Sequence, residues 1–246
     1  MARGLTLFRV DGRSNQDPRT VKITPRFLAF PEGSALIEVG QTKVICTASV
    51  EDRVPGWRRG QGRGWVTAEY SMLPRATLTR RDRETGPSGL GGRTQEIQRL
   101  VGRSIRAIVD MEKLGERTIF LDCDVIQADG GTRTAAISGA YVALYQAVSR
   151  MLKTGIIKNN PLKGAVAAIS VGVISDEMIL DLCYDEDSRA DLDFNVVMTD
   201  QGDLVEIQGT AEGEPFPRGI VDDLISLADI GIKYHMEAQN TAIQGI

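Results

Sequence analysis

Two short segments combine paired glycines with threonine and arginine: Gly91-Gly92-Arg93-Thr94 and Gly130-Gly131-Thr132-Arg133-Thr134. Glycine lets the backbone come close to a ligand, and the free N–H groups at the start of a helix favour an anion. Arginine in a first helical turn opposes the helix dipole, a conflict that a bound anion would remove. Each segment alone is a weak motif, because neither matches a P-loop or a dinucleotide fingerprint. Together they predict phosphate binding.

A run of carboxylates between Asp185 and Asp193 is the second group that could do chemistry. One interpretation is a solvated acidic loop, which is what most such runs are. The run leads into Phe194-Asn195-Val196-Val197-Met198, however, so its last members should begin a buried strand. Asp191 and Asp193 would then project from one face, and Asp187 could fold back towards them. Clustered carboxylate oxygens suit Mg²⁺ or Mn²⁺, although the spacing is not that of an EF-hand.

Histidine and cysteine usage excludes other kinds of site. His235 is the only histidine, and we expect it to be structural. Catalytic triads and hydrolytic metal sites built on histidine are therefore not expected. Cys46, Cys123 and Cys183 are odd in number, far apart and without a CxxC pair. They suggest neither a disulfide framework nor a zinc site, and they fit a reducing cytoplasm.

Charge is distributed unevenly along the chain. The net charge of -4 and the pI of about 5.2 would alone argue against a nucleic-acid partner. Residues 53–106, however, contain twelve arginines, no lysine and four carboxylates, for a net charge of +8. The residues from Asp176 onward have a net charge of -14. Arginine without lysine favours forked contacts with phosphate groups over simple solubility.

Residue periodicity predicts a mixed α+β arrangement. Alternating and β-branched segments predict strands at 20–30, 35–39, 43–47, 65–70, 118–126, 165–174, 178–183, 194–199 and 204–208. Apolar residues at helical spacing predict helices from Arg93 to near Gly115, over 134–152, and for about 20 residues after Pro217. Each half runs from strands to a helix. No linker or low-complexity run divides the halves, so we expect one structural unit, with internal duplication as one explanation of the likeness.

Length and composition are those of an ordinary globular protein. The chain has 246 residues, of which 42% are hydrophobic and 25% charged, enough to bury a substantial core. The first five residues lack the apolar region of a signal peptide, and no apolar run approaches the roughly 20 residues that span a bilayer. We therefore expect a cytoplasmic protein without membrane contact.

Segments spread over nearly the whole chain resemble the RNase PH family, which is similar to polynucleotide phosphorylase cores and exosome ring subunits. The resemblance is carried by Gly64-Trp65-Val66-Thr67-Ala68-Glu69-Tyr70, Met72-Leu73-Pro74-Arg75-Ala76-Thr77, Gly92-Arg93-Thr94-Gln95-Glu96-Ile97-Gln98-Arg99-Leu100, Asp129-Gly130-Gly131-Thr132-Arg133-Thr134-Ala135-Ala136 and Asp185-Glu186-Asp187-Ser188. It implies two related βα units with mixed sheets and packed helices, forming a single domain over residues 1–246. It further implies a homo-oligomer, a hexameric ring of three dimers.

The resemblance also implies roles for individual residues. Phosphate binding falls on Arg93, Gly131, Thr132 and Arg133. Catalysis, or binding of Mg²⁺ or Mn²⁺, falls on Asp187 and Asp193, with Asp185 and Asp191 as supporting candidates. RNA contact falls on Arg75, Arg80 and Arg83. The stretch with Arg58, Arg59 and Arg63 is richer in arginine than is usual in the family, which indicates either tighter RNA capture or a local variation.

The activity implied by the resemblance is phosphate-dependent 3′-to-5′ trimming of RNA, tRNA precursors in particular, with release of nucleoside diphosphates. Inorganic phosphate is then a co-substrate, and the reverse reaction adds nucleotides. One alternative is a hydrolytic, metal-dependent exoribonuclease that uses the same aspartates. Another is a catalytically silent RNA-binding ring subunit, which the presence of Arg93, Asp187 and Asp193 disfavours.

Overall fold

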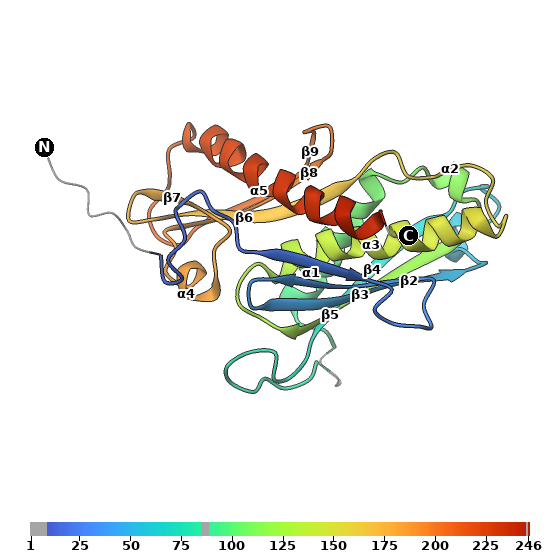
Figure 1. The fold of residues 1–246 in the computed structure, drawn as a ribbon, viewed down its shortest axis with the longest axis horizontal. Helices are drawn as coiled ribbons and strands as arrows, with labels where there is room; N and C mark the ends of the chain where they lie inside the picture. Colours follow the sequence, from blue (N-terminus) through green and yellow to red (C-terminus); the bar gives the residue numbers. More distant parts are fainter. Residues whose placement is uncertain (1–8, 85–88, 245) are drawn as a thin grey trace, which may run out of the picture.

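The computed structural model describes residues 9–84, 89–244 and 246, and it contains two mixed or antiparallel sheets with helices packed against them (Figure 1). The first sheet has five strands in the order β1-β2-β3-β5-β4. Its strands are β1 (Val21–Pro25), β2 (Gly33–Val39), β3 (Thr42–Glu51), β4 (Trp65–Met72) and β5 (Thr118–Gln127). The helices of this half are η1 (Gly56–Arg58), α1 (Gly92–Ala107), α2 (Met111–Leu114) and α3 (Thr132–Lys153).

The second sheet has four antiparallel strands in the order β7-β6-β8-β9. Its strands are β6 (Val166–Ile174), β7 (Glu177–Leu180), β8 (Leu192–Thr199) and β9 (Leu204–Ala211). The helices of this half are α4 (Tyr184–Asp187) and α5 (Ile220–Ile243). The expected α+β class, with two strand-and-helix units, is confirmed.

Helix α3 joins the two halves through a common core. Its small residues let it lie close to the first sheet: a side chain at Gly139 would come within 2.7 Å of Cys46 Sγ. Val166 and Ala168 of β6 belong to the same buried cluster as α3 and the first sheet. In Figure 1, α3 and α5 lie on the same side of the first sheet. Burial on both sides explains why α3 tolerates so little polarity along its length.

The parallel pair β4 and β5 determines where the glycine loops lie. Trp65 pairs with Thr118 and Met72 with Val125, so both strands run towards the same edge of the sheet. Each strand is followed by glycines and then by a helix, α1 after β4 and α3 after β5. Because parallel strands end at the same edge, the two predicted anion loops are brought to one end of the molecule.

Three elements differ from the sequence-based expectation. The helix from Arg93 stops at Ala107, because Asp110 caps a separate short helix by accepting hydrogen bonds from the amides of Glu112 and Lys113. The strand predicted over 20–30 ends at Pro25, followed by Arg26 at φ 53°. The strand predicted over 178–183 ends at Leu180, because Asp181 has φ 55° and turns the chain.

Within the described residues, no helix has the length and apolar character needed to cross a membrane. The first eight residues, on which the expectation about a signal peptide partly rests, lie outside the described part of the chain.

Candidate active site

The second glycine loop turns sharply into α3. Gly130 and Gly131 have φ values of 70° and 63°, a region that favours glycine. Gly131 is the N-cap of α3; no side chain of the described residues caps the helix, and its first turn contains no acidic residue. The Thr132 hydroxyl lies 2.8 Å from the hydroxyl of Tyr70, and Thr134 donates to the Gly131 carbonyl at 2.9 Å. The first-turn N–H groups are thus free for an anion.

Arg133 is held in place by two side chains from other elements. Its Nη1 donates to Gln208 of β9 at 2.7 Å and lies 3.4 Å from a carboxylate oxygen of Glu96 on α1. Gln208 in turn donates to Glu96 at 2.7 Å. This arrangement fixes one edge of the guanidinium and leaves Nε and Nη2 without a protein partner in the part of the chain that the structure describes. These two nitrogens form the fork that suits a phosphate.

The first glycine loop presents Arg93 at the start of α1. Its N-cap, Gly91, makes no side-chain capping bond, and its amide donates to Glu84 at 3.2 Å. Arg93 is exposed and forms no ion pair with the described residues. Burial raises the pKa of Tyr70, although the charges of Arg93 and Arg133 act to lower it. Both guanidinium groups therefore lie close enough to the Tyr70 hydroxyl for their charges to act there.

Asp187 and Asp193 belong to the second half of the chain and lie within electrostatic range of Arg93 and Arg133. Asp187 is the last residue of α4, and half-buried Asp193 lies in β8, paired with Gly172 and Thr210. Burial raises the pKa of Asp193 to about 6, and the Asp187 carboxylate adds to this rise. Asp187 is exposed, yet partial desolvation of its carboxyl group raises the pKa, against the opposing charges of Arg93 and Arg133. The four charged groups thus act on one another across a single site.

The two other aspartates of the acidic run lie elsewhere. The Asp191 carboxylate accepts a hydrogen bond from the Ser175 amide at 2.8 Å, at the turn between β6 and β7. Asp185 is exposed and borders a neighbouring pocket that Arg13, Arg19 and Asp129 also line. Asp191 therefore does not join Asp193 in the site, although both were expected on one face of the strand, because the Ser175 amide binds the Asp191 carboxylate.

The loop with the candidate RNA-contacting arginines is attached beside the second glycine loop. Ala76 is buried, and its carbonyl accepts a hydrogen bond from the Ala128 amide at 2.8 Å. This contact anchors the exposed side chains of Arg75, Arg80 and Arg83 at the site end of the sheet. The loop was expected to continue to Gly92, but residues 85–88 lie outside the described part of the chain.

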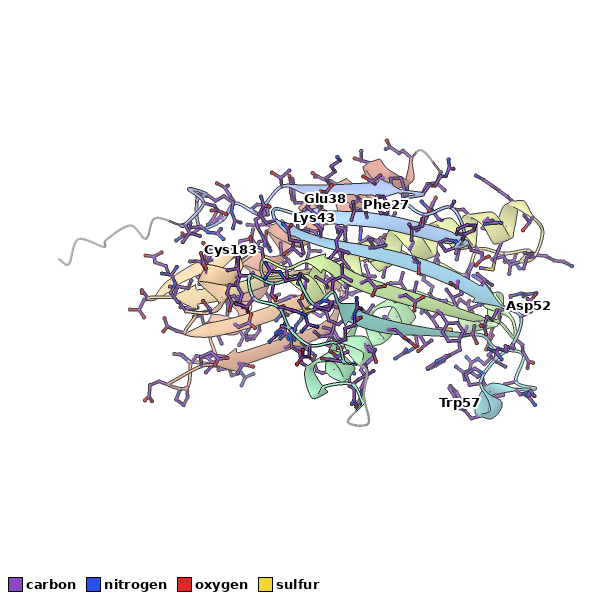
Figure 2. The ribbon with its side chains drawn as sticks, turned by 90° about the horizontal axis from the view of Figure 1, so that it is seen from below. Phe27, Glu38, Lys43, Asp52, Trp57 and Cys183 are labelled. Atoms are coloured by element: carbon purple, nitrogen blue, oxygen red, sulfur yellow. The ribbon has the colours of Figure 1, made fainter. Side chains whose placement is uncertain are left out.

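The basic segment is not one continuous surface. In Figure 2, Asp52 and Trp57 lie at the opposite end of the first sheet from Cys183, which precedes α4. Arg58 stacks near Trp57 and Trp65 at that far end, with its guanidinium carbon 5.2 and 5.4 Å from the ring centres. Arg63 pairs there with Glu112 at 3.1 Å. Strand β4 therefore divides the arginines between the two ends of the sheet.

Sequence reasoning missed Tyr70, Glu96 and Gln208 as parts of the site. Tyr70 lies within a segment that carried the family resemblance, but nothing local indicated that its hydroxyl contacts Thr132. Glu96 and Gln208 meet Arg133 only because α1, α3 and β9 pack together. No spacing rule connects positions so far apart in the chain.

His235 is buried on α5, and its side chain bonds to Ser138 of α3 within the core. Its Nδ1 lies 3.1 Å from the Ser138 hydroxyl. Burial lowers the pKa of His235 to about 4, aided by the charge of Arg19 and opposed by that of Asp181. A group held neutral in this way can change the stability of the fold with pH.

Replacement of His235 by glutamine should remove a pH-dependent loss of stability. With a folded pKa of about 4 and an unfolded pKa of 6.5, the unfolded state binds more protons between these values. The stabilisation by neutral His235 is complete above pH 6.5 and declines as the pH falls to 4, by about 3 kcal/mol. Chemical denaturation of both proteins at several pH values, without divalent metal, measures the difference.

The comparison with the variant is needed because Asp193 acts in the opposite direction. Its raised pKa makes the folded state bind a proton first as the pH falls from 6, which favours folding in the same range. This contribution is common to both proteins and cancels in their difference. Parallel stability curves for the wild type and His235→Gln would contradict the assigned role of the histidine.

The donor set at the site suits a cation that needs few protein ligands. Among residues 9–84, 89–244 and 246, no group of three or more His, Cys, Asp or Glu side chains could hold a metal. Mg²⁺ usually binds one or two carboxylates and completes its shell with water and substrate phosphates. Asp187 and Asp193 fit that pattern, and a carboxyl with a pKa near 6 also exchanges protons readily at neutral pH.

The fold and the site define an α+β protein in which two arginines at helix starts lie within electrostatic range of two carboxyl groups. Residues 17–150 match domain 1 of the 3′ exoribonuclease family (RNase PH), and residues 164–231 match its domain 2. The chain belongs to the RNase PH family of 3′ exoribonucleases. The two matched parts correspond to the halves built on the first and the second sheet.

Solved structures share the fold over nearly the whole chain. Rice (Oryza sativa) Rrp46 superposes with a TM-score of 0.74 at 22% identity, covering 95% of this chain and 99% of the other. A chain of the Archaeoglobus fulgidus exosome with RNA bound to the active site gives 0.76 at 21%, covering 93% and 91%. An archaeal exosome core gives 0.73 at 19%, covering 94% and 91%. At these identities the likeness concerns the fold.

Proposed function

We propose that the protein is a phosphate-dependent 3′-to-5′ exoribonuclease that removes nucleotides from RNA as nucleoside diphosphates. The observation that carries this proposal is the mutual electrostatic influence of Arg93, Arg133, Asp187 and Asp193 beside two uncapped helix starts. Membership of the 3′ exoribonuclease family supports the substrate class. Two arginines with donor groups that have no partner among the described residues can bind the oxygens of inorganic phosphate in addition to the RNA backbone.

In the proposed reaction, Arg93, Arg133 and the backbone at Gly131 and Thr132 bind inorganic phosphate. One of its oxygens attacks the phosphorus of the last phosphodiester in line, and the bond to the 3′ oxygen of the preceding nucleotide breaks. Asp193 donates the proton that this oxygen gains. The arginines stabilise the negative charge that develops on the transferring group. Such electrostatic stabilisation is usually the main contribution to catalysis of phosphoryl transfer.

Asp187 would hold Mg²⁺, or Mn²⁺ in its place, and Asp193 would join it as a ligand in its ionised form, after its proton has passed to the 3′ oxygen. When bound, the cation would neutralise charge on the transferring group and the leaving oxygen. The remaining positioning is done by the protein: Gln208 and Glu96 orient Arg133, and Tyr70 orients Thr132.

The direct test is incubation of the protein with a short 3′-labelled RNA and Mg²⁺, with and without inorganic phosphate. We expect shortening only when phosphate is present, with labelled nucleoside diphosphate as the product. Equal shortening without phosphate, with release of nucleoside monophosphates, would indicate the hydrolytic alternative. Binding of RNA without shortening under either condition would indicate a silent subunit.

The exposed arginine loop should contribute to RNA affinity by charge alone. Among the described residues, Arg80 pairs with exposed Asp82 alone, at 2.7 Å, and its exposed side chain is available to phosphate groups. Arg80→Ala should weaken RNA binding and reduce the slope of log affinity against log salt by about 0.7, the value for one phosphate contact on a single strand. Titrations of a labelled single-stranded RNA at several salt concentrations measure both quantities.

Arg150→Ala is the matched control for Arg80→Ala. Arg150 is an exposed arginine near the C-terminal end of α3, whereas the phosphate site lies at the N-terminal end of the same helix. Its removal changes the net charge equally and should leave the affinity and the salt slope unchanged. Equal effects of the two substitutions would show that net charge, and not the loop, determines RNA binding.

We also propose that the RNA is a precursor tRNA with an accessible 3′ extension and that the protein works in the cytoplasm.

We further propose that the protein forms a ring of identical subunits. The exosome assemblies that share its fold support the ring. So does the loop after β1, where Phe30 is 96% exposed and Phe27 and Leu28 are also exposed. Sedimentation velocity should show a species of about six times the chain mass; a purely monomeric protein would contradict the ring.

A further inference from the structure

Arg19 is a buried residue that contacts both halves of the candidate site. Its side chain is 4% exposed and forms a forked ion pair with Asp181, with Nη2 to Oδ1 at 2.7 Å and Nε to Oδ2 at 3.0 Å. The Arg19 amide donates to the same carboxylate at 2.7 Å. The third nitrogen, Nη1, donates to the carbonyl of Asp129 immediately before the glycines. One guanidinium thus binds both the glycine loop and the chain that leads into α4.

The glycine loop and the segment before α4 touch at the level of the backbone. A side chain at Gly130 would lie 2.6 Å from the Leu182 carbonyl oxygen, and one at Gly131 would lie 2.8 Å from Arg19 Nη2. The Tyr184 amide donates to the Asp129 carboxylate at 3.2 Å. No side chain separates the two segments, so a shift of one displaces the other.

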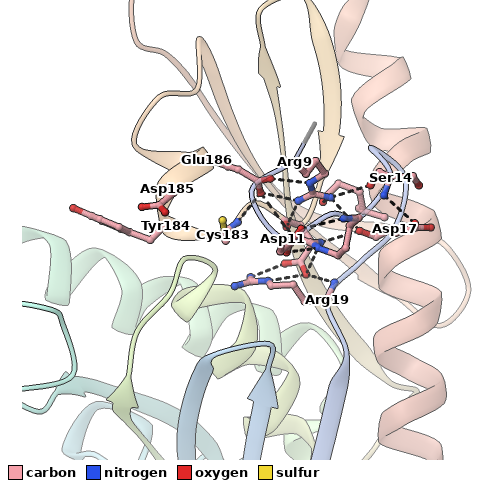
Figure 3. A network of polar contacts seen from close by, with 12 residues as sticks. Arg9, Asp11, Ser14, Asp17, Arg19, Cys183, Tyr184, Asp185 and Glu186 are labelled. Atoms are coloured by element: carbon pink, nitrogen blue, oxygen red, sulfur yellow. Dashed lines mark hydrogen bonds and ion pairs between the residues drawn. The ribbon is translucent and has the colours of Figure 1, made fainter. Parts of the chain in front are cut away.

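A second buried arginine fixes α4 itself. Arg9 forms a forked ion pair with Glu186, at 2.8 Å from Nε and 2.7 Å from Nη2. It also donates to the carbonyls of Leu180 and Asp181, both at 2.9 Å. Glu186 accepts a hydrogen bond from the Cys183 amide at 3.0 Å and precedes Asp187 in the helix. Figure 3 shows these contacts between the segment from Arg9 to Arg19 and α4.

We propose that Arg19 is a positioning residue that sets the distance between the phosphate-binding glycine loop and the carboxyl group of Asp187. The inference rests on the proposed function, because it concerns the geometry of that reaction. Arg19 touches neither the RNA nor the phosphate: it acts through the carbonyl of Asp129 on one side and through the carboxylate of Asp181 on the other. Only a planar fork can satisfy both partners, since the point charge of lysine has no fixed second edge.

The test compares Arg19→Lys, Asp181→Asn and the double variant with the wild type in phosphate-dependent RNA shortening. We expect kcat/KM for phosphate to fall roughly 10- to 100-fold, the range for loss of a group that orients site residues. RNA affinity should fall by less than phosphate use, because Arg75, Arg80 and Arg83 are exposed on a loop that meets segment 127–134 through the hydrogen bond from the Ala128 amide to the Ala76 carbonyl. The double variant should lose no more than the worse single variant, because both changes break the same contact.

Amide hydrogen exchange provides a second readout that needs no activity. We expect faster exchange in 127–134 and in 181–188 together in both single variants, with β2 unchanged. Arg117→Lys is the control, since Arg117 pairs with Asp52 at 2.8 Å near the start of β5, at the far end of the sheet. If the wild type fails to use phosphate, the proposed function fails while the exchange result still decides the role of Arg19.

Three results would overturn the role. One is unchanged kcat/KM for phosphate in Arg19→Lys. Another is faster exchange in only one of the two segments. The third is an equal loss of RNA affinity and phosphate use together with faster exchange throughout the chain, which would show a general loss of folding. Asp181→Asn keeps the shape of its side chain, so it decides the matter where Arg19→Lys does not fold.

Discussion

Asp193→Asn should abolish RNA shortening while leaving RNA binding intact. Asparagine has nearly the same shape but cannot supply a proton or a full negative charge, so kcat should fall by about 10²- to 10⁴-fold. RNA affinity should be retained, because the arginines that face the RNA are unchanged. Folding should also be retained, because burial already disfavours the charged form of this carboxyl group. Single-turnover assays and RNA titrations on the same preparation separate these quantities.

Asp191→Asn is the matched control for this prediction. It makes the same chemical change two residues away, at a carboxylate held by the Ser175 amide at the turn between β6 and β7. We expect its turnover to stay close to that of the wild type, with at most a small loss of stability. Full activity in Asp193→Asn, or equal inactivation by both changes, would show that Asp193 does not have the assigned role.

Arg93→Ala should have the second-largest effect and should act on the use of phosphate. The Arg93 guanidinium lies at the start of α1 without a partner among the described residues, where a bound anion would also relieve the conflict with the helix dipole. Loss of one such donor should lower kcat/KM for phosphate by about 10²- to 10³-fold. Arg93→Lys should recover only part of this loss, because it restores the charge without the fork. Rates measured over a series of phosphate concentrations give both values.

The control for Arg93 is Arg99→Ala, an exposed arginine that faces a different side of α1. It should leave kcat/KM for phosphate unchanged, even if it alters RNA affinity slightly. Equal losses in Arg93→Ala and Arg99→Ala would indicate that phosphate use depends on the overall charge of α1 rather than on the guanidinium fork at its start.

The parts of the site that follow from local rules could be predicted from the sequence. The glycine pairs predict the loops before α1 and α3, because only glycine adopts the φ values of Gly130 and Gly131 freely. The arginines after them predict an anion site, because their charge opposes the helix dipole. The order of strands and helices followed from periodicity. The errors lay mainly in where elements end, as near Asp110 and Asp181, where one side chain or one dihedral angle stops an element.

The parts that depend on tertiary packing could not be predicted. The alternation of side chains along a strand predicts one face for Asp191 and Asp193. The Ser175 amide, however, binds the Asp191 carboxylate, and only Asp193 contributes to the site. The arginines near Arg58 and those near Arg80 belong to one basic segment, yet β4 carries them to opposite ends of the sheet. The Arg19 and Asp181 pair joins positions far apart in the chain, so no pattern of neighbours reveals it.

The measurement that tests the central proposal most directly follows the oxygen atoms of inorganic phosphate. The wild-type protein is incubated with an unlabelled single-stranded RNA, Mg²⁺ and phosphate enriched in oxygen-18, and the released nucleotides are analysed by mass spectrometry. The proposed reaction predicts nucleoside diphosphates with the label in the terminal phosphate group, and no release without phosphate. Unlabelled nucleoside monophosphates, formed at the same rate with and without phosphate, would contradict it.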